Sequence, residues 1–427
     1  SISPSKMNIP KILNNNLVLK RIFCRNYSVK VLGIETSCDD TAVAIVNEKR
    51  EILSSERYTE RAIQRQQGGI NPSVCALQHR ENLPRLIEKC LNDAGTSPKD
   101  LDAVAVTVTP GLVIALKEGI SAAIGFAKKH RLPLIPVHHM RAHALSILLV
   151  DDSVRFPFSA VLLSGGHALI SVAEDVEKFK LYGQSVSGSP GECIDKVARQ
   201  LGDLGSEFDG IHVGAAVEIL ASRASADGHL RYPIFLPNVP KANMNFDQIK
   251  GSYLNLLERL RKNSETSIDI PDFCASLQNT VARHISSKLH IFFESLSEQE
   301  KLPKQLVIGG GVAANQYIFG AISKLSAAHN VTTIKVLLSL CTDNAEMIAY
   351  SGLLMLVNRS EAIWWRPNDI PDTIYAHARS DIGTDASSEI IDTPRRKLVT
   401  STIHGTERIR FRNLDDFKKP KSPKTTE

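Results

Sequence analysis

The chain alternates between short apolar runs and longer segments whose apolar residues recur every three or four positions. Short runs bounded by polar residues or glycine are typical of buried strands, and the longer periodicity is typical of helices with one buried face. The predicted strands cover 30–35, 41–46, 102–108, 132–136, 157–163, 168–173, 306–308 and 331–338. The predicted helices cover 73–94, 114–130, 247–262 and 272–296, and others begin near His138, Gly191, Asn315 and Cys341. This order of elements predicts an α/β protein.

The elements run through two rounds, and each round opens with two strands joined by a polar turn. The turn of the first round is 36–40, and the turn of the second is 164–167. Because 427 residues exceed what one hydrophobic core usually supports, we expect two domains. The predicted division is a first α/β lobe over 30–150 and a second over 151–381, in which 205–245 is rich in loops.

Composition excludes several classes of protein. No run reaches the roughly 18 apolar residues that a membrane-spanning helix needs, so no membrane role is expected. A net charge of +5 permits a nucleic-acid partner without requiring one. The seven cysteines are scattered and include no Cys-x-x-Cys, so they indicate neither a disulfide framework nor a zinc ribbon.

The two ends differ from the rest of the chain. Residues 1–29 contain basic but no acidic side chains, and Arg25-Asn26-Tyr27-Ser28 is similar to a mitochondrial cleavage site, so a transit peptide and the mitochondrial matrix are predicted. The alternative is a basic arm without a targeting role. Residues 382–427 form a polar, basic tail. We expect this tail to be solvated, although it could also touch RNA phosphates.

Two glycine-rich turns follow predicted strands of the second lobe. Glycine lets the backbone approach a phosphate closely, and successive amides in such a turn can bind an anion. Ser164-Gly165-Gly166-His167 is the first turn, and Gly309 to Asn315 is the second, running into a predicted helix. A strand, a glycine turn and a helix N-terminus together predict a nucleotide site. The alternative is a tight structural turn.

A pair of histidines follows the predicted strand 132–136. If a helix begins near His138, then His139 and His143 lie one turn apart on the same face, as two ligands of one metal ion must. Chance spacing is the alternative. Asp343, near a helix N-terminus and after a strand, is the best-placed third ligand. Two histidines and one carboxylate leave coordination positions open for a substrate, and iron, zinc or magnesium could occupy such a site.

Six short motifs then occur in the order found in one known family. They are Gly33-Ile34-Glu35-Thr36-Ser37-Cys38-Asp39-Asp40-Thr41, the pair His139 and His143, Ser164-Gly165-Gly166-His167, Gly-Glu-x-x-Asp195-Lys196, Gly310-Gly311-Val312-x-x-Asn315 and Cys341-Thr342-Asp343-Asn344. On these motifs the sequence resembles the tRNA N6-adenosine threonylcarbamoyltransferases from about Val31 to Arg366. With an import signal in front, it is similar to the mitochondrial members.

The resemblance implies a fold, a reaction and a set of site residues. The fold is that of the actin-like ATPases, shared with sugar kinases and Hsp70, with two lobes around a central nucleotide cleft. The metal ligands implied are His139, His143 and Asp343, with one divalent ion per subunit. Asp39 and Asp40 match the acidic pair of the family that faces the reaction centre, and we expect Asp40, with Asp39 as second choice, to be the catalytic base. The implied substrate contacts are Leu162, Leu163, Ser164, Gly165, Gly166, Asp195, Gly214, Glu218, Ala314, Asn315 and Thr342.

The implied reaction moves a threonylcarbamoyl group from threonylcarbamoyl-AMP to N6 of the adenosine 3′ of the anticodon, in mitochondrial tRNAs that read codons beginning with A. The implied partners are tRNA, a separate synthase that makes the donor, and a second copy of the chain in a homodimer. An actin-like ATPase or kinase and a non-catalytic tRNA-binding protein remain alternatives. A metallopeptidase is disfavoured because Met140 and Arg141, beside the histidines, cannot act as a base. His79, His167, Cys38 and Cys341 are expected to be structural or to line the cleft.

Overall fold

The structure is a computed structural model that describes residues 28–60, 70–202, 204–208, 210–262, 267–358 and 364–413. It forms two compact units, which are described separately. The first comprises Ser1–Asp152 and Asp343–Ser380, and the second comprises Ser153–Thr342 and Asp381–Glu427. The predicted lobes put 343–380 in the second lobe, whereas this segment belongs to the first unit. Apart from Ser28 and Val29, the predicted transit peptide lies outside the described residues.

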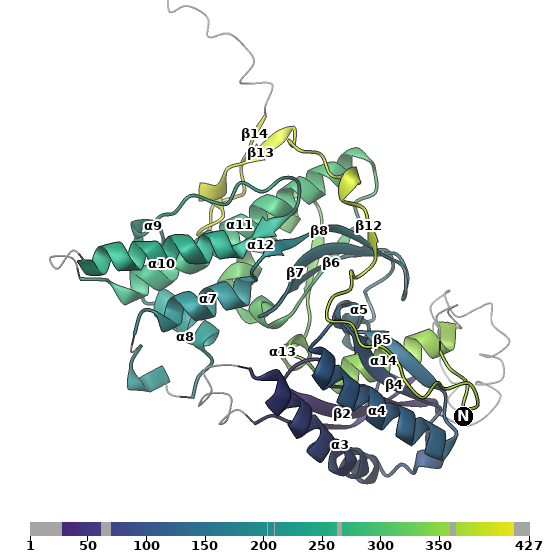
Figure 1. Ribbon diagram of the computed structural model, residues 1–427. Helices are drawn as coiled ribbons and strands as arrows, with labels where there is room; N and C mark the ends of the chain where they lie inside the picture. Colours follow the sequence, from purple (N-terminus) through teal and green to yellow (C-terminus); the bar gives the residue numbers. More distant parts are fainter. Residues whose placement is uncertain are drawn as a thin grey trace, which may run out of the picture. The chain divides into compact units, whose positions relative to one another are not determined.

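The first unit contains a five-stranded sheet in the order β3-β2-β1-β4-β5. Strands β2, β4 and β5 of this sheet are labelled in Figure 1. Its strands are β1 (Lys30–Glu35), β2 (Thr41–Asn47), β3 (Ile52–Tyr58), β4 (Ala103–Thr109) and β5 (Leu134–His138). Strands β1, β2 and β3 form an antiparallel meander, while β4 and β5 run parallel to β1. The carboxyl ends of β1, β4 and β5 therefore meet at one edge of the sheet.

The residues of β1 alternate between the two faces of this sheet. Leu32 and Ile34 pack with apolar residues of α3 (Pro72–Asp93) and α4 (Val113–His130). Gly33 faces α14 (Ala345–Asn358), where a Cβ atom would lie only 2.4 Å from the Ala349 nitrogen. The missing side chain lets this late helix pack closely on the first strand. The close packing brings the residues just before α14 to the strand edge described above.

The second unit repeats this topology. Its sheet has the order β11-β10-β6-β7-β8-β12, and β9 (Met244–Asn245) pairs with β8. The strands are β6 (Phe158–Leu163), β7 (Ala168–Ala173), β8 (Phe179–Ser187), β10 (Gln305–Gly309), β11 (Thr332–Lys335) and β12 (Thr384–Asp385). Strands β6, β7 and β8 form an antiparallel meander, and β10 and β11 run parallel to β6. Two mixed sheets with one shared strand order confirm the expected α/β actin-like architecture.

Helices surround the core of the second unit. They are α7 (Pro190–Arg199), α8 (Val213–Ala221), α9 (Gly228–Arg231), α10 (Phe246–Lys262), α11 (Ile270–Glu298), α12 (Gln316–Ala328) and α13 (Leu338–Cys341). The long helix α11 contributes large buried side chains, among them Phe273, Phe292 and Phe293. It packs against α8, α9 and α12. Helix α11 is therefore the central helix against which α8, α9 and α12 pack.

Most predicted elements are present, and the main differences are the following. The predicted helix after His138 is two helices, α5 (His139–Leu145) and α6 (Ile147–Val150). Strands β3 and β8 were not predicted. The segment 205–245, expected to be rich in loops, contains α8 and α9. Residues 382–413, expected to be solvated, bury Ile382, Ile390 and Ile403, and they include β13 (Arg396–Leu398) paired with β14 (Phe411–Asn413).

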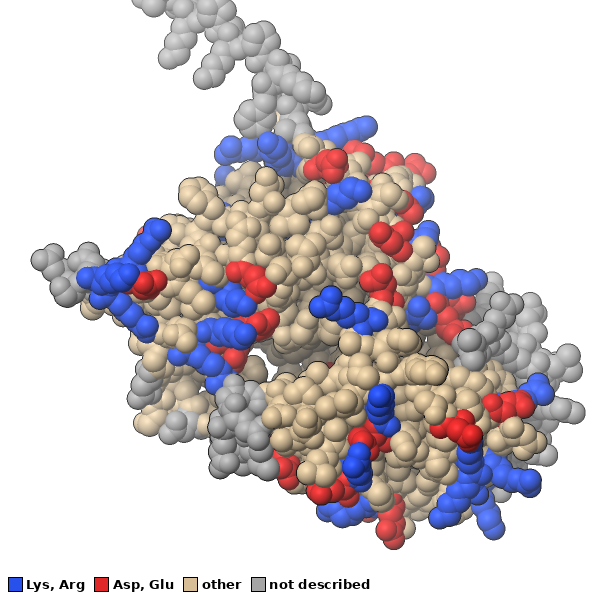
Figure 2. Space-filling view, viewed as in Figure 1, with Lys and Arg blue, Asp and Glu red and all other residues tan. Residues whose placement is uncertain are grey.

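Charged side chains of both signs are spread over the face drawn in Figure 2, and Lys and Arg gather at the end of α10. Lys262 at this end pairs with Glu258 of the same helix, and Arg261 donates to the Gln200 carbonyl oxygen, so part of this charge is already engaged within the protein. In the described part of the chain, no helix is long and apolar enough to cross a membrane.

Candidate functional site

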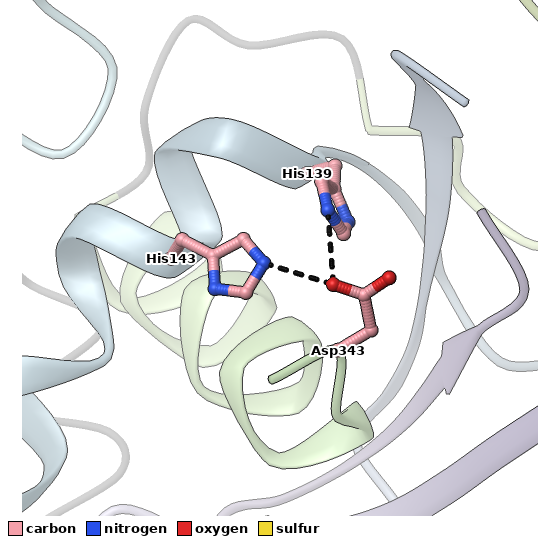
Figure 3. Close-up of side chains that lie close together, drawn as sticks. All are labelled: His139, His143 and Asp343. Carbon is pink, nitrogen blue, oxygen red and sulfur yellow. Dashed lines mark hydrogen bonds and ion pairs between the residues drawn. The ribbon is translucent and has the colours of Figure 1, made fainter. Parts of the chain in front are cut away.

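Three predicted metal ligands converge in the first unit (Figure 3). His139 is the first residue of α5, whose N-terminus is capped by the His138 side chain at the end of β5. His143 lies one turn later, and the two imidazole rings meet edge to face with centroids 4.6 Å apart. Asp343 lies just before α14, the helix that packs on β1. The predicted trio therefore comes together, although two hundred residues separate His143 from Asp343.

The spacing of the three ligand atoms suits one metal ion. Asp343 Oδ1 lies 3.4 Å from His139 Nε2 and 3.2 Å from His143 Nε2. Two ligand atoms that are each about 2.1 Å from one ion lie about 3.0 Å apart at a right angle and about 3.4 Å apart at a tetrahedral angle. Both histidines are buried, whereas the Asp343 side chain is 27% exposed. The donor set fits a divalent ion that keeps an open side.

Behind His139 lies a carboxylate that the predictions did not include. Glu35, the last residue of β1, is fully buried, and its Oε2 lies 3.1 Å from His139 Nδ1. The same carboxylate accepts hydrogen bonds from the Ser37 backbone N–H and from the Thr107 hydroxyl, each at 2.5 Å. Ser37 Oγ also lies 3.2 Å from His139 Nδ1. By contrast, His143 Nδ1 is buried without a hydrogen-bond partner among the described residues.

The charges of this cluster shift the pKa values of its members. Burial alone would lower the pKa of His139, but the carboxylates of Asp343 and Glu35 outweigh burial and raise it to about 10. Burial alone would raise the pKa of Asp343, but the two histidines hold it well below its usual range. Asp343 is therefore ionised at neutral pH, as a metal ligand must be.

The turn between β1 and β2 carries Asp39 and Asp40 in the same unit. Two residues of α3 hold the backbone of this turn: Gln78 Nε2 donates to Asp39 O at 2.7 Å, and His79 Nε2 lies 3.0 Å from Cys38 O. The Thr59 hydroxyl donates to the Asp40 carboxylate. His79 is therefore structural, as predicted, and the turn is rigidly supported from behind.

Asp40 has the pKa expected of a general base. Burial raises the pKa of its carboxyl to about 6, and the negative charges of Asp39 and Asp343 act in the same direction. Arg57 on β3 partly opposes this shift, and its guanidinium lies 3.4 Å from the Asp343 carbonyl oxygen. Burial also strongly raises the pKa of the Cys38 thiol, so this residue is not a thiolate nucleophile.

In the second unit, the two glycine turns lie at adjacent strand ends. Because β6 and β10 are parallel neighbours, the turn after Leu163 and the turn after Gly309 share one edge of the sheet. Gly310 has φ of 88°, and a Cβ there would lie 2.4 Å from Leu163 O, so only glycine fits. In the first turn, Ser164 Oγ accepts hydrogen bonds from the Gly166 and His167 amides.

Predicted contacts on the helices reach the same edge. Asn315 caps α12 by accepting a hydrogen bond from the Ile318 N–H, and Glu218 of α8 accepts one from the Gln316 N–H at 2.6 Å. Ala314 O accepts a hydrogen bond from the Gln316 side chain. The helix N-terminus and its two polar neighbours thus lie beside the second glycine turn.

The remaining predicted substrate contacts differ in burial and in their partners. Leu162 and Leu163 are buried in β6, so only their backbone could meet a ligand. Asp195 forms a two-point ion pair with Arg199 on α7. Gly214 lies in the first turn of α8, and Thr342 is exposed after α13.

Glu35, Thr59, Gln78 and Thr107 are site residues that the sequence analysis missed. Glu35 offered a signal, since a carboxylate that ends an apolar strand is unusual unless it has a buried partner. Thr59 follows β3, a strand that was not predicted. Thr107 lies in a β-branched strand where threonine is common, so its sequence context carried no signal.

The fold and site define a class: an α/β protein of two units with one repeated actin-like topology, whose first unit holds a two-histidine, one-carboxylate group. The family model described as tRNA N6-adenosine threonylcarbamoyltransferase matches residues 51–350. The chain belongs to this family. It is an enzyme that transfers a threonylcarbamoyl group to N6 of a tRNA adenosine.

Named relatives agree with this assignment. The tRNA N6-adenosine threonylcarbamoyltransferase, mitochondrial, of Rattus norvegicus is 33% identical over 91% of this chain and 97% of its own length. The Homo sapiens protein of the same name is 34% identical over 86% of this chain and 90% of its length. The bacterial enzyme of Chromobacterium violaceum is 34% identical over 76% and 93%.

Solved structures resemble the chain more weakly. The match to T. kodakarensis HypF has 14% identity and a TM-score of 0.47, and covers 78% of this chain and 48% of that one. Component A of the (R)-2-hydroxyglutaryl-CoA dehydratase of Acidaminococcus fermentans gives 13% identity and a TM-score of 0.44, over 78% and 99%. These scores are low, and the fold assignment depends on the sheet topology described above.

Proposed function

We propose that the donor is threonylcarbamoyl-AMP, that the acceptor is the adenosine 3′ of the anticodon in mitochondrial tRNAs reading codons that begin with A, and that the first unit carries the chemistry. The observation that supports this most is the convergence of His139, His143 and Asp343 close to the acidic turn of Asp39 and Asp40. All of these residues belong to one unit.

The three ligands would hold one divalent ion, either iron, zinc or magnesium. When bound, such an ion supplies positive charge that neutralises phosphate or carbamoyl oxygens of the donor. The exposed side of Asp343 leaves room for a substrate atom beside the ligands. Arg57, which reaches the Asp343 backbone, adds a second positive charge at this place.

Asp40 would accept the proton of the attacking amine. As the amine nitrogen forms its bond to the carbamoyl carbon, the bond from that carbon to the phosphate oxygen breaks and AMP leaves. The nitrogen must then lose a proton, and a carboxylate with a pKa of about 6 is mostly ionised at neutral pH and still basic enough to take it. Asp39, on the same turn, is the second choice.

The second unit would hold the adenylate. Its glycine turns place backbone amides and small residues at the shared edge of β6 and β10, where a phosphate could approach closely. Asn315, which caps α12, and Glu218 of α8, which contacts the first residue of α12, supply polar groups that suit a ribose or a base. The substrate contacts among Leu162, Leu163, Ser164, Gly165, Gly166, Asp195, Gly214, Ala314 and Thr342 belong to this proposal.

We further propose that the enzyme works in the mitochondrial matrix as a homodimer and receives its donor from a separate synthase. The mitochondrial names of several relatives support the compartment. Centrifugation of the purified protein would give the oligomeric state. Microscopy of a tagged full chain, with and without residues 1–29, would test import.

The decisive assay supplies threonylcarbamoyl-AMP and unmodified mitochondrial tRNA to the purified protein and detects the modified nucleoside by mass spectrometry. In single turnovers, Asp40→Asn should slow transfer by about 10² to 10⁴-fold while donor binding persists. Asp39→Asn is the matched variant and should have the smaller effect. An unchanged rate for Asp40→Asn would exclude Asp40 as the base.

Two competing functions predict other results. An actin-like ATPase or kinase would release phosphate or ADP from ATP without tRNA or donor, which is measured in the same preparation. A non-catalytic tRNA-binding protein would bind tRNA equally well after His139→Ala and modify none. Modified nucleoside that depends on His139, in a preparation that releases neither phosphate nor ADP from ATP, would exclude both.

A further inference from the structure

The hydrogen bonds of Glu35 orient His139, a neighbouring residue proposed above as a metal ligand. Glu35 is fully buried, and three donors surround its two oxygens. Oε1 faces the Ser37 backbone N–H, and Oε2 faces both the Thr107 hydroxyl and His139 Nδ1. Burying a carboxylate costs free energy of desolvation, which well-placed partners only offset. If stability were the sole role of this position, an apolar residue would stabilise the fold at least as well.

The pattern determines the role of His139 Nδ1. An ionised carboxylate can only accept hydrogen bonds, so each of its neighbours must donate. The Ser37 backbone N–H is a donor in any case, and the Thr107 hydroxyl can rotate to become one. His139 Nδ1 must therefore donate to Glu35, so the atom that can bind a cation is Nε2, which faces Asp343 and loses its own proton when a metal ion binds.

We infer that Glu35 is a positioning residue of the metal centre, which holds His139 in the Nδ1-protonated form with its Nε2 directed at the ion. This inference rests on the metal centre proposed above. His143 Nδ1 lacks a comparable partner among the described residues, so of the two rings it is His139 that a carboxylate orients through Nδ1. Carboxylates behind a metal-bound histidine commonly contribute about 10 to 100-fold in metal affinity.

Glu35→Gln tests this role because an amide cannot satisfy all three donors. If its oxygen takes the Oε2 position, the NH₂ group meets the Ser37 N–H. If its NH₂ group takes that position, it donates to His139 Nδ1, and the proton must move to Nε2, where it blocks the ligand atom. Both arrangements also remove the negative charge behind His139, so both weaken the metal centre while keeping the size of the side chain.

Thr107→Val is the matched control. It removes one donor to Glu35 Oε2 but leaves the bond to His139 intact, and valine has nearly the same shape as threonine. A role of Glu35 in stability alone would make the two variants similar, with lower unfolding midpoints and unchanged metal affinity. The inferred role instead predicts different metal affinities for the two variants, because only Glu35→Gln changes the group that His139 Nδ1 contacts.

The probe is Zn²⁺ alone, titrated by equilibrium dialysis against the full chain. Glu35→Gln should lower Zn²⁺ affinity by about 10 to 100-fold, and Thr107→Val by less than about threefold. Equal affinity of folded Glu35→Gln and the unsubstituted protein overturns the inference. Absence of Zn²⁺ binding by the unsubstituted protein overturns the metal centre itself, and the inference with it.

A second measurement needs no variant and stands even if Glu35→Gln fails to fold. Nitrogen NMR of the unsubstituted protein with labelled histidine should show His139 Nδ1 protonated, both without metal and with Zn²⁺ bound through Nε2. A spectrum in which Nδ1 is unprotonated, or in which Zn²⁺ binds Nδ1, overturns the inference.

Discussion

Each unit contains two histidines and one carboxylate whose ligand atoms lie within 4.8 Å of one another, yet the two groups differ in chemistry. The group of the first unit is His139, His143 and Asp343. In the second unit, His290 and Glu294 lie one turn apart on α11, and His329 caps the end of α12. The two groups therefore have similar residue types and spacing, but their carboxylates, Asp343 and Glu294, have different neighbours.

Glu294 already has a cation. Arg396 donates to its Oε1 through Nε and Nη2, at 3.1 and 2.6 Å. The Arg396 carbonyl oxygen lies 2.5 Å from His290 Nε2, and His290 Nδ1 lies 3.1 Å from His329 Nε2. A single chain of neutral imidazole hydrogen bonds explains these contacts.

The electrostatics of the two groups follow from this difference. In the second unit, burial lowers the pKa of both histidines, that of His329 to about 4, whereas in the first unit His139 has a raised pKa. The Glu294 side chain is only 6% exposed, compared with 27% for Asp343. Among the described residues, Asp343 has no arginine paired with its carboxylate and is reached by solvent, so it can bind a metal ion. Glu294 is buried and already paired with Arg396, so the second group has a structural role.

The largest expected effect is a difference in metal content between a variant of the first group and a variant of the second. His143→Ala removes a ligand, so the protein should lose its ion and the transfer rate should fall by about 10³-fold or more. His329→Phe in the other group should keep both metal and rate. Metal analysis of the purified variants, together with single-turnover transfer, checks this prediction. Metal lost from His329→Phe and kept in His143→Ala would reverse the assignment of the two groups.

A large effect on stability is expected from Arg396→Met, which leaves Glu294 buried without its cation. The free energy of unfolding should fall by about 3 kcal/mol, the lower end for a broken buried pair, because Arg396 is partly exposed. Arg395→Met breaks the more exposed pair with Glu298 and should cost less than about 1 kcal/mol. Urea unfolding measures both. Equal losses for the two variants would show that Glu294 is not effectively buried.

The sequence predicted the first group because its residues stand in local patterns. His139 and His143 follow a strand and share a helix face, and Asp343 stands beside a helix start. The second group was not predicted: Arg396 lies in a segment that sequence composition marked as solvated, while in the structure its guanidinium stacks 4.5 Å from the Phe411 ring. Contacts between distant segments of this kind leave no local periodicity.

The missed elements have similar physical reasons. Strand β3 is an edge strand in which only Ser54 is buried, and its apolar run is limited to Ile52 and Leu53, which is too short to be recognised. Glu35 was visible as an anomaly in β1, but its partner Thr107 lies 72 residues away. Local patterns thus predicted the ligands, while the residues that orient them depend on how strands pair.

A smaller effect concerns the pH dependence of transfer in the first unit. The pKa of Asp40 is raised to about 6, so the fraction of ionised base rises as pH increases through 6. The single-turnover rate at pH 5 should therefore be about one tenth of its plateau value above pH 7. Asp40→Asn should be slow and should lose this rise. If the rise persists in that variant, another group is the base.

The smallest effect is a pH dependence of stability in the second unit. His329 has an unfolded pKa near 6.5 and a folded pKa of about 4, so the unfolded chain binds more protons between these values. Its contribution to stability is therefore complete above pH 6.5 and is lost as pH falls toward 4. Lowering pH from 7 to 5.5 should cost about 1 kcal/mol through this residue.

His329→Phe removes the titrating ring and can pack beside Phe293 and Phe411, whose centroids lie 5.0 and 5.2 Å from that of His329. Urea unfolding of both proteins at pH 7 and 5.5 should show a smaller acid loss in the variant. The difference between the two losses isolates His329, because carboxylates elsewhere titrate equally in both. An identical acid loss would mean that the second group is charged in the folded state, and the contrast between the two groups would then be lost.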